Sequence, residues 1–278
     1  MRELPLAAQN KLSAIERAAE DAAALVQASL SRARQLSAAL SAAEAGEIPG
    51  DIVGLTRELE TTRAAQSARQ ARYSTIMGCL NAVRVWAEGQ PPHVVLEPAP
   101  VAVEPPEGEP LPAVIDRIRA TLTATVTELR AVERAPLPVA DLKAAMRQQV
   151  AALADRGRPS INIERGALEI NFRRQQSTIP GTTPDDVAAS LAWLDADLLI
   201  ARLDAEIDAL PTPPLALSAA DKANRRAALT ARIDTLERQE EALIEMALAS
   251  GQDVVRRANA SPAAVLGVRA RARAGRAA

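Results

Sequence analysis

The sequence contains very few of the side chains on which metal sites and many active sites depend. Its 278 residues include one cysteine, Cys79, and one histidine, His93. One cysteine cannot form an intramolecular disulfide, and two isolated ligands without the usual spacing cannot hold a zinc or iron ion. A lone histidine in a proline-rich stretch supplies no catalytic triad, and no glycine-rich phosphate-binding motif occurs. We therefore expect no catalytic residue, cofactor, metal or small-molecule substrate, a solvated His93 and a buried Cys79.

Aromatic residues and long apolar runs are also scarce. Only four residues are aromatic, and alanine supplies most of the 48% apolar share. A buried alanine methyl contributes about 0.8 kcal/mol against roughly 2 kcal/mol for a leucine, which favours long helices packed along one another over a compact enzyme. No apolar run approaches the ~20 residues that span a bilayer, and the first residues lack a secretory pattern. We expect a cytoplasmic protein, or one assembled into a virion in the cytoplasm, with no membrane contact.

Neither sign of charge dominates. The 33 basic and 35 acidic residues leave a net charge of −2. The whole chain therefore has no strong field that would attract nucleic acid or a membrane surface. Arginine supplies all but three of the basic residues, which is typical of GC-rich bacterial coding.

A heptad repeat runs through residues 8 to 43, and a second one follows after Pro49 and Gly50. Steps of four and three predict helices that each lay one stripe against another helix. The first stripe is Ala8, Leu12, Ile15, Ala19, Ala22, Val26, Ser29, Ala33, Leu36, Leu40 and Ala43; the second is Ile52, Leu55, Leu59, Thr62, Gln66, Arg69, Tyr73, Ile76, Leu80, Val83 and Ala87. Two equal stripes joined by a short turn predict an antiparallel coiled-coil hairpin over residues 1–90.

The seam of this hairpin, or of an oligomer built on it, is expected to depend on its larger aliphatic residues. These are Leu12, Ile15, Val26, Leu36, Leu40, Leu59, Ile76, Leu80 and Val83. The second stripe is polar in its middle, and polar seam positions fix register at a cost in stability. Alternatively, the second helix is rotated, with Ala64, Ala65 and Ala68 inside. Asp51 is the expected N-cap of this helix.

Residues 91–110 predict an acidic, proline-rich linker. Lysine and arginine are absent from it. Proline removes a backbone donor and clashes with the preceding helical turn, so the segment is expected to be extended. It acts either as a hinge between two units or as a segment that docks on a helix through its valines and Leu96.

Residues 111–250 predict a helical domain that contains one β-hairpin. Apolar periodicity and proline breaks indicate helices near 111–135, 139–156, 187–210 and 218–250, and the third is preceded by a helix-start signal at Thr183 and Pro184. Apolar residues on alternate positions predict the β-hairpin near 160–173. A lone hairpin is marginal in water, so it should lean on a helix or pair with another copy. It serves either as a structural cap or as an edge for a partner strand.

Several paired carboxylates lie on the predicted helices. They are Asp195 with Asp197, Asp204 with Asp208, and Glu240 with Glu241. A general acid needs a concave, partly dry site, whereas carboxylates on long helices that also carry arginines usually form a solvated, salt-bridged face. We expect the solvated face.

Residues 251–278 predict a disordered, arginine-rich tail, within which Ser261-Pro262 can start a short turn of helix that Gly267 ends. After Asp253 it contains no acid and six arginines: Arg256, Arg257, Arg269, Arg271, Arg273 and Arg276. Such a cluster can contact the phosphates of DNA or RNA, although no aromatic residue accompanies it for base stacking. The alternatives are a solubilising tail that contacts nothing specific, and pairing with the acidic linker within the chain or between copies.

Residues 236–268 combine an Arg/Glu-rich helix, a break at Gly251 and an ending with Ser261-Pro262 and Val265-Leu266-Gly267. In these features the last quarter of the chain resembles uncharacterised helical proteins of bacterial prophage-type operons. The resemblance implies a phage-associated accessory or structural protein and identifies no active site.

The sequence thus predicts an all-α fold of antiparallel coiled-coil or helical hairpins, with one small β-hairpin and a disordered basic tail. The predicted function is non-enzymatic, that of a structural, scaffolding or adaptor protein such as a phage or prophage assembly or virion component. Its expected partners are further copies of the chain or helices of partner proteins. The alternative is a nucleic-acid-associated protein that contacts DNA or RNA through the arginine tail.

Overall fold

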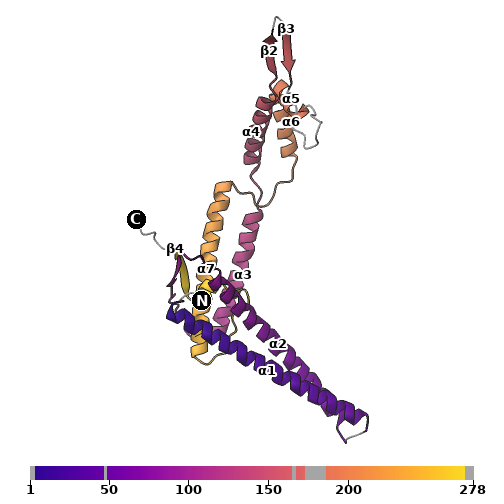
Figure 1. Ribbon diagram of the computed structural model, residues 1–278, viewed down its shortest axis with the longest axis vertical. Coiled ribbons are helices and arrows are strands. Elements are labelled where there is room, and N and C mark those ends of the chain that lie inside the picture. Colours follow the sequence, from indigo (N-terminus) through magenta and orange to yellow (C-terminus); the bar gives the residue numbers. More distant parts are fainter. Residues whose placement is uncertain (1–3, 47–48, 165–166, 173–185, 273–278) are drawn as a thin grey trace. The chain divides into compact units, whose positions relative to one another are not determined.

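The computed structural model describes residues 4–46, 49–164, 167–172 and 186–272. Within these ranges the chain is mostly helical with two small two-stranded sheets (Figure 1), which confirms the all-α class at this level. The chain divides into two compact units, residues 1–127 with 229–278, and residues 128–228. Across the described ranges, no helix combines the length and apolar character that a bilayer-crossing segment needs.

Helices α1 (Leu6–Glu44) and α2 (Ile52–Glu88) form an antiparallel pair in the first unit (Figure 1). Ion pairs join Glu16 to Arg84 at 2.6 Å and Arg32 to Glu58 nearer the turn. All buried residues of α1 belong to the predicted stripe: Ala8, Ile15, Ala19, Ala22, Val26, Ser29, Ala33, Leu36 and Ala43. Alanine and serine dominate this list, and such small side chains allow two helix backbones to approach closely.

The polar middle of α2 faces α1. Arg69 donates a hydrogen bond to the Ser29 hydroxyl, and Gln66 and Ala65 are half-buried, whereas Ala64 and Ala68 are exposed. The rotated arrangement is therefore wrong for Ala64 and Ala68, while Ala65 is as buried as Gln66. Asp51 occupies the N-cap position of α2, but its side chain makes no capping hydrogen bond.

The acidic linker is docked in the first unit. Its strand β1 (Val94–Pro98) pairs antiparallel with β4 (Val268–Ala272), with Glu97 opposite Arg269. Leu96 and Val268 are buried in the same apolar cluster as Ile15 of α1. Of the two predicted roles for the linker, docking is the one that the structure shows.

Parts of α3 (Leu111–Arg134) and α7 (Ala219–Ala249) complete the first unit. Val114 and Ile115 of α3 form an apolar cluster with Leu243 and Ile244 of α7. The segment after α7 crosses α2 so closely at Gly78 that a Cβ there would lie 2.9 Å from the Ala258 Cβ. It leads into the short helix α8 (Pro262–Val265) and then into β4.

These contacts correct two predictions. The predicted domain 111–250 is divided, because its two ends pack with the N-terminal hairpin and only residues 128–228 form the second unit. The predicted disordered tail at 251–278 is wrong for its part up to residue 272, which contains the strand β4 and α8, the latter at the predicted turn of helix after Ser261. The physical reason is that this segment supplies apolar residues to the core and strand partners to β1, gains that composition alone does not reveal.

The second unit packs α4 (Val139–Gly157) against α5 (Val187–Leu194) and α6 (Ala196–Asp208). The helix predicted over 187–210 is broken at Asp195, whose carboxylate accepts a hydrogen bond from the Leu198 amide at 2.9 Å and caps α6. At Gly157 a Cβ would lie 1.9 Å from the Ala189 carbonyl oxygen, so only glycine permits this approach of α4 to α5. The predicted helix start at Thr183 lies outside the described residues.

The predicted β-hairpin is present in the second unit. Strands β2 (Ser160–Glu164) and β3 (Ala167–Asn171) pair antiparallel, with Ile161 opposite Ile170 and Ile163 opposite Leu168. Because side chains alternate along a strand, all four aliphatic residues share one face.

Candidate functional site

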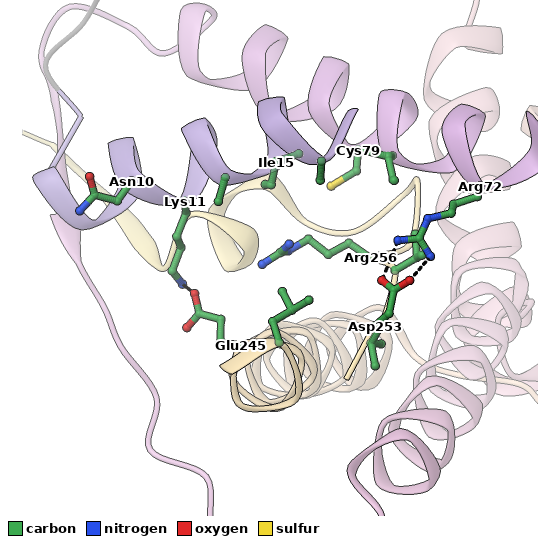
Figure 2. A pocket seen from close by; sticks show the side chains of 14 residues that line it. Asn10, Lys11, Ile15, Arg72, Cys79, Glu245, Asp253 and Arg256 are labelled. Carbon is green, nitrogen blue, oxygen red and sulfur yellow. Dashed lines mark hydrogen bonds and ion pairs between the residues drawn. The ribbon is translucent and has the colours of Figure 1, made fainter. Parts of the chain in front are cut away.

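A cavity of about 510 Å³ opens in the first unit between the α1–α2 pair and the end of α7 with the segment that follows it (Figure 2). An ion pair between Lys11 and Glu245 lies at its rim, and so does one between Arg72 and Asp253, both at 2.6 Å. The side chain of Arg256 extends between these two pairs in Figure 2. The cavity therefore combines an apolar body with one further charged group, whose position is fixed by the network described next.

Helix α7 supplies the acidic half of this network. Glu240 and Glu241 are only 3% and 4% exposed, and Glu237 lies one turn earlier, a spacing that places it beside them on the helix surface. Buried carboxylates are rare in proteins unless they are paired. The predicted solvated face is therefore wrong for Glu240 and Glu241.

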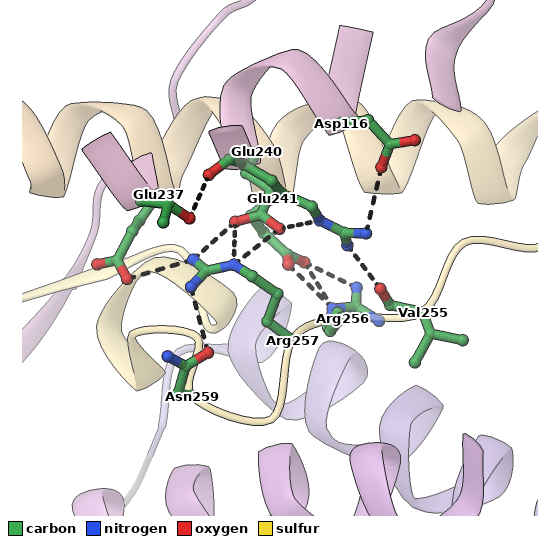
Figure 3. A network of polar contacts seen from close by, with 10 residues as sticks. Asp116, Glu237, Glu240, Glu241, Val255, Arg256, Arg257 and Asn259 are labelled. Atoms are coloured by element: carbon green, nitrogen blue, oxygen red, sulfur yellow. Dashed lines mark hydrogen bonds and ion pairs between the residues drawn. The ribbon is translucent and has the colours of Figure 1, made fainter. Parts of the chain in front are cut away.

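The segment after α7 supplies the basic half. It begins at Gly251, which adopts a left-handed φ of 75°, a conformation that glycine adopts without strain. Nε of Arg256 donates to the two carboxylate oxygens of Glu241 at 3.1 and 2.9 Å, and Nη2 donates at 2.7 Å (Figure 3). Arg257 contacts Glu240 in the same way, with its Nη2 at 2.8 Å.

A third arginine joins α3 to the network. Nε of Arg119 donates to Glu240 at 2.7 Å, and its Nη2 donates to the Val255 carbonyl oxygen at 2.7 Å (Figure 3). Glu240 is thus shared by two guanidinium groups, while Arg257 also lies 3.5 Å from Glu237. The network fixes α3, α7 and the segment around Arg256 as one structure.

A neighbouring arginine on α7 anchors the small sheet. Arg238 is buried, donates to Asp234 at 3.0 Å, and donates through Nη2 to the Val268 carbonyl oxygen at 3.0 Å. Its contact lies at the first residue of β4, so α7 holds both the network and the strand that pairs with β1.

The energetics of this network are those of paired buried charges. Moving a carboxylate out of water costs several kcal/mol, which close and multiply hydrogen-bonded partners offset. The pairs therefore add little net stability, but the loss of one partner strands a buried charge at a cost of about 3–5 kcal/mol. This asymmetry favours one arrangement of the segment around Arg256 over all others.

Burial and pairing shift several pKa values. Burial raises the pKa of Glu241, against the opposing hydrogen bonds and charge of Arg256, and burial also raises the pKa of Glu237. For Arg256, burial acts to lower the pKa, but the hydrogen bonds and charge of Glu241 outweigh it and raise the pKa. Arg256 therefore remains a fixed cation at the edge of the cavity.

Cys79 lines the same cavity. Desolvation raises the pKa of its buried thiol. A raised pKa keeps the group as a thiol, which is a poor nucleophile and a poor metal ligand. The expected burial of Cys79 is confirmed.

The second unit carries a contrasting feature, an exposed aliphatic surface on its hairpin. Ile161, Ile163, Leu168 and Ile170 are 63%, 75%, 64% and 49% exposed. We call this surface the hairpin face. Phe172, the next residue of the same alternation, is also exposed and meets Trp193 of α5 edge-on, with the ring centroids 6.5 Å apart.

The structure brings most of the predicted seam residues together between α1 and α2. Ile15, Val26, Leu36, Leu59, Ile76, Leu80 and Val83 are buried. Leu12 packs half-buried against the cluster that contains Leu80, and Leu40 against the cluster that contains Leu36. They lie where the heptad pattern predicted contacts within the hairpin; contacts between copies stay a prediction.

The structure separates the six predicted nucleic-acid contacts. Arg256 and Arg257 are paired with buried carboxylates and do not belong to a free tail, so this pairing disfavours their contact with DNA or RNA, which stays a prediction. Arg269 and Arg271 lie exposed on β4, where Arg271 is 3.6 Å from Glu97 of the linker. Pairing of tail and linker was one of the predicted alternatives. Arg273 and Arg276 lie outside the described residues.

The sequence indicated Glu240 and Glu241 as a carboxylate pair but on a solvated face, and neither Glu237 nor Arg119 was predicted to take part. One signal was present: Glu240 interrupts the apolar stripe of the last helix, and two consecutive arginines follow the helix. A charge at a seam position implies a buried partner, but the sequence did not indicate which arginine supplies it.

Within the described ranges, no cluster of three or more histidine, cysteine or acidic residues is placed to hold a metal ion. His93 is exposed. No protein-family model matches this chain, and neither a curated protein nor a solved structure is significantly similar to it. The resemblance to prophage-type proteins thus rests on the sequence pattern alone.

Proposed function

We propose that this chain is a non-enzymatic structural or adaptor protein that assembles with copies of itself through the hairpin face. The observation that carries the proposal is the exposure of four aliphatic side chains on one face of β2–β3. A two-stranded hairpin is marginal in water unless its apolar face is covered. In the part of the second unit that the structure describes, every hairpin residue with a placed side chain is exposed, so no helix of the unit covers the face.

A second copy suits the chemistry of this face. Its four residues carry no charge, so two identical faces meet without repulsion, while the polar residues Asn162, Glu169 and Asn171 lie on the opposite side of the hairpin. The exposed aliphatic residues together with Phe172 offer roughly 500 Å² per copy, so a symmetric pair would bury about 1,000 Å², near the lower bound for a specific interface. Face-to-face packing of two such sheets is the expected geometry.

The first unit suits a structural role. Its buried carboxylates are bound by arginines, which makes them poor candidates for general acid or base catalysis. The α1–α2 pair, which we interpret as a coiled coil, is a long element stabilised along a heptad seam. A phage-type structural or accessory component would use such a chain, because its assemblies repeat contacts between identical copies.

The test is the molar mass in solution across a range of protein concentrations, measured by light scattering after size exclusion. We expect the wild-type chain to form dimers or larger oligomers, and Ile163→Lys to shift it to monomers because the lysine places a charge in the apolar contact. Asn162→Lys is the matched control: it adds the same charge one residue away on the opposite face and should leave the mass unchanged. A monomeric wild-type chain at about 100 μM, or an oligomer that survives Ile163→Lys, would contradict the proposal.

A further inference from the structure

The cavity of the first unit has the composition of a binding site for an amphipathic molecule. Ile15 of α1 lines it (Figure 2). So do Ile76 of α2, Leu248 of α7 and Val255 of the segment after α7. Its volume of about 510 Å³ lies in the range of small-molecule sites, which bury an apolar body and orient it with a few polar groups.

The charged residues around this cavity are unequal in number. Lys11, Arg72 and Arg256 line it, against the carboxylates of Glu245 and Asp253. Each carboxylate already has a cation at 2.6 Å. The partner of Arg256, Glu241, lies outside the cavity lining. Counting Glu241, the charges balance three to three; Arg256 differs from the other two cations in that its carboxylate does not line the cavity.

Arg256 also has hydrogen-bonding capacity to spare. Its bonds to Glu241 use Nε and Nη2. Within the part of the chain that the structure describes, Nη1 donates no hydrogen bond, yet it is not among the buried unpaired atoms, so it remains reachable by solvent or a ligand. A guanidinium with one edge fixed by a carboxylate presents its other edge in a defined orientation.

We propose that this cavity binds a small aliphatic molecule that ends in an anionic group, a carboxylate or a phosphate. The anion accepts hydrogen bonds from Nη1 of Arg256, and the aliphatic part packs between Ile15 and Ile76 on one side and Leu248 and Val255 on the other. The proposal does not depend on the hairpin face, because all the residues involved belong to the first unit.

Titration calorimetry on the full-length chain with octanoate, octyl phosphate, octan-1-ol and octyltrimethylammonium tests the class of ligand. We expect both anions to bind at least about tenfold more tightly than the alcohol or the cation, because only an anion gains a charge-assisted bond to Arg256. Whichever of octanoate and octyl phosphate binds more tightly then identifies the preferred head group, a carboxylate or a phosphate. An alcohol that binds as tightly as the anions, or no binding of either anion up to about 10 mM, would overturn the proposal.

The site itself is tested by filling the cavity without touching the ion pairs. Ala18 lines the cavity and its side chain is exposed, so Ala18→Phe adds bulk into the cavity without disturbing the core. The matched control is Ala28→Phe, an exposed position on the same helix outside the cavity. We expect octanoate to bind at least about tenfold more weakly to Ala18→Phe and unchanged to Ala28→Phe, with both melting like the wild type. Unchanged binding to Ala18→Phe would place the ligand elsewhere.

Discussion

The ion-pair network of the first unit and the hairpin face of the second unit are opposite cases. In the first unit, charged groups are buried, and the carboxylates of Glu240 and Glu241 are bound by arginines. In the second unit, aliphatic groups are exposed on the hairpin face, and nothing in the described part of that unit covers them. A buried charge whose partner is present is satisfied within its own chain. An exposed apolar face, in contrast, indicates an interface with another molecule.

The largest loss of stability in the first unit is expected when a charge is placed in the α1–α2 seam. Leu80 is buried at 3% exposure, so Leu80→Asp should lower the free energy of unfolding by at least about 3 kcal/mol, through lost packing and an unpaired buried charge. Urea unfolding followed by circular dichroism measures this loss. Asn81→Asp, an exposed neighbour, should change it by less than about 0.5 kcal/mol. Unchanged helicity and melting for Leu80→Asp would show that the seam is assigned to the wrong residues.

The ion-pair network predicts the next largest effect. Arg256→Ala leaves Glu241 buried without its arginine and should cost about 3–5 kcal/mol, while Arg271→Ala, at an exposed pair 3.6 Å from Glu97, should cost less than about 0.5 kcal/mol. Replacing Glu241 and Arg256 together by leucine and methionine should restore most of the stability, because no charge is then stranded. Equal losses for the two single arginine variants in urea unfolding would refute the distinction between buried and surface pairs.

The burial of Glu237 should make the stability of the first unit depend on pH. Burial raises its pKa in the folded chain above the ordinary 4.5, so the folded state keeps this proton at pH values where the unfolded state has lost it. The contribution of Glu237 to stability is therefore fully present below pH 4.5 and is lost as the pH rises through the folded-state pKa. The wild-type stability minus that of Glu237→Gln should fall as the pH rises through this window, measured by unfolding at a series of pH values. A difference that rises with pH would mean that Arg257 dominates over burial.

The smallest effect on folding is expected on the hairpin face. Ile163→Lys makes the same kind of change as Leu80→Asp, an aliphatic side chain replaced by a charge, but at a site that is 75% exposed. Thermal unfolding in dilute solution, where copies are separate, should show a change within about 0.5 kcal/mol. A loss comparable to that of Leu80→Asp would mean that Ile163 is covered within its own chain.

Local periodicity made part of this fold predictable. The α1 stripe follows from steps of three and four, and the β2–β3 hairpin follows from the alternation around Ile161 and Leu168, because each pattern is set by backbone geometry over a few residues. The partners of Glu240 and Glu241 could not be predicted in this way. Their arginines lie 17 and 15 residues further on, past a glycine break, where no helical or strand period fixes which side chains meet. Alternation likewise predicts an apolar hairpin face but not whether anything covers it.

The central claim, that a second copy covers the hairpin face, is tested most directly by a distance between copies. A single spin label at Asn162→Cys in a Cys79→Ala background sits on the polar side of the hairpin, so it leaves the proposed contact intact. Two sheets packed face to face are about 10 Å apart, so pulsed electron paramagnetic resonance should show one intermolecular distance on the order of 20–40 Å, and Ile163→Lys should abolish it. If the labelled chain without Ile163→Lys gave no defined intermolecular distance, the account would be contradicted.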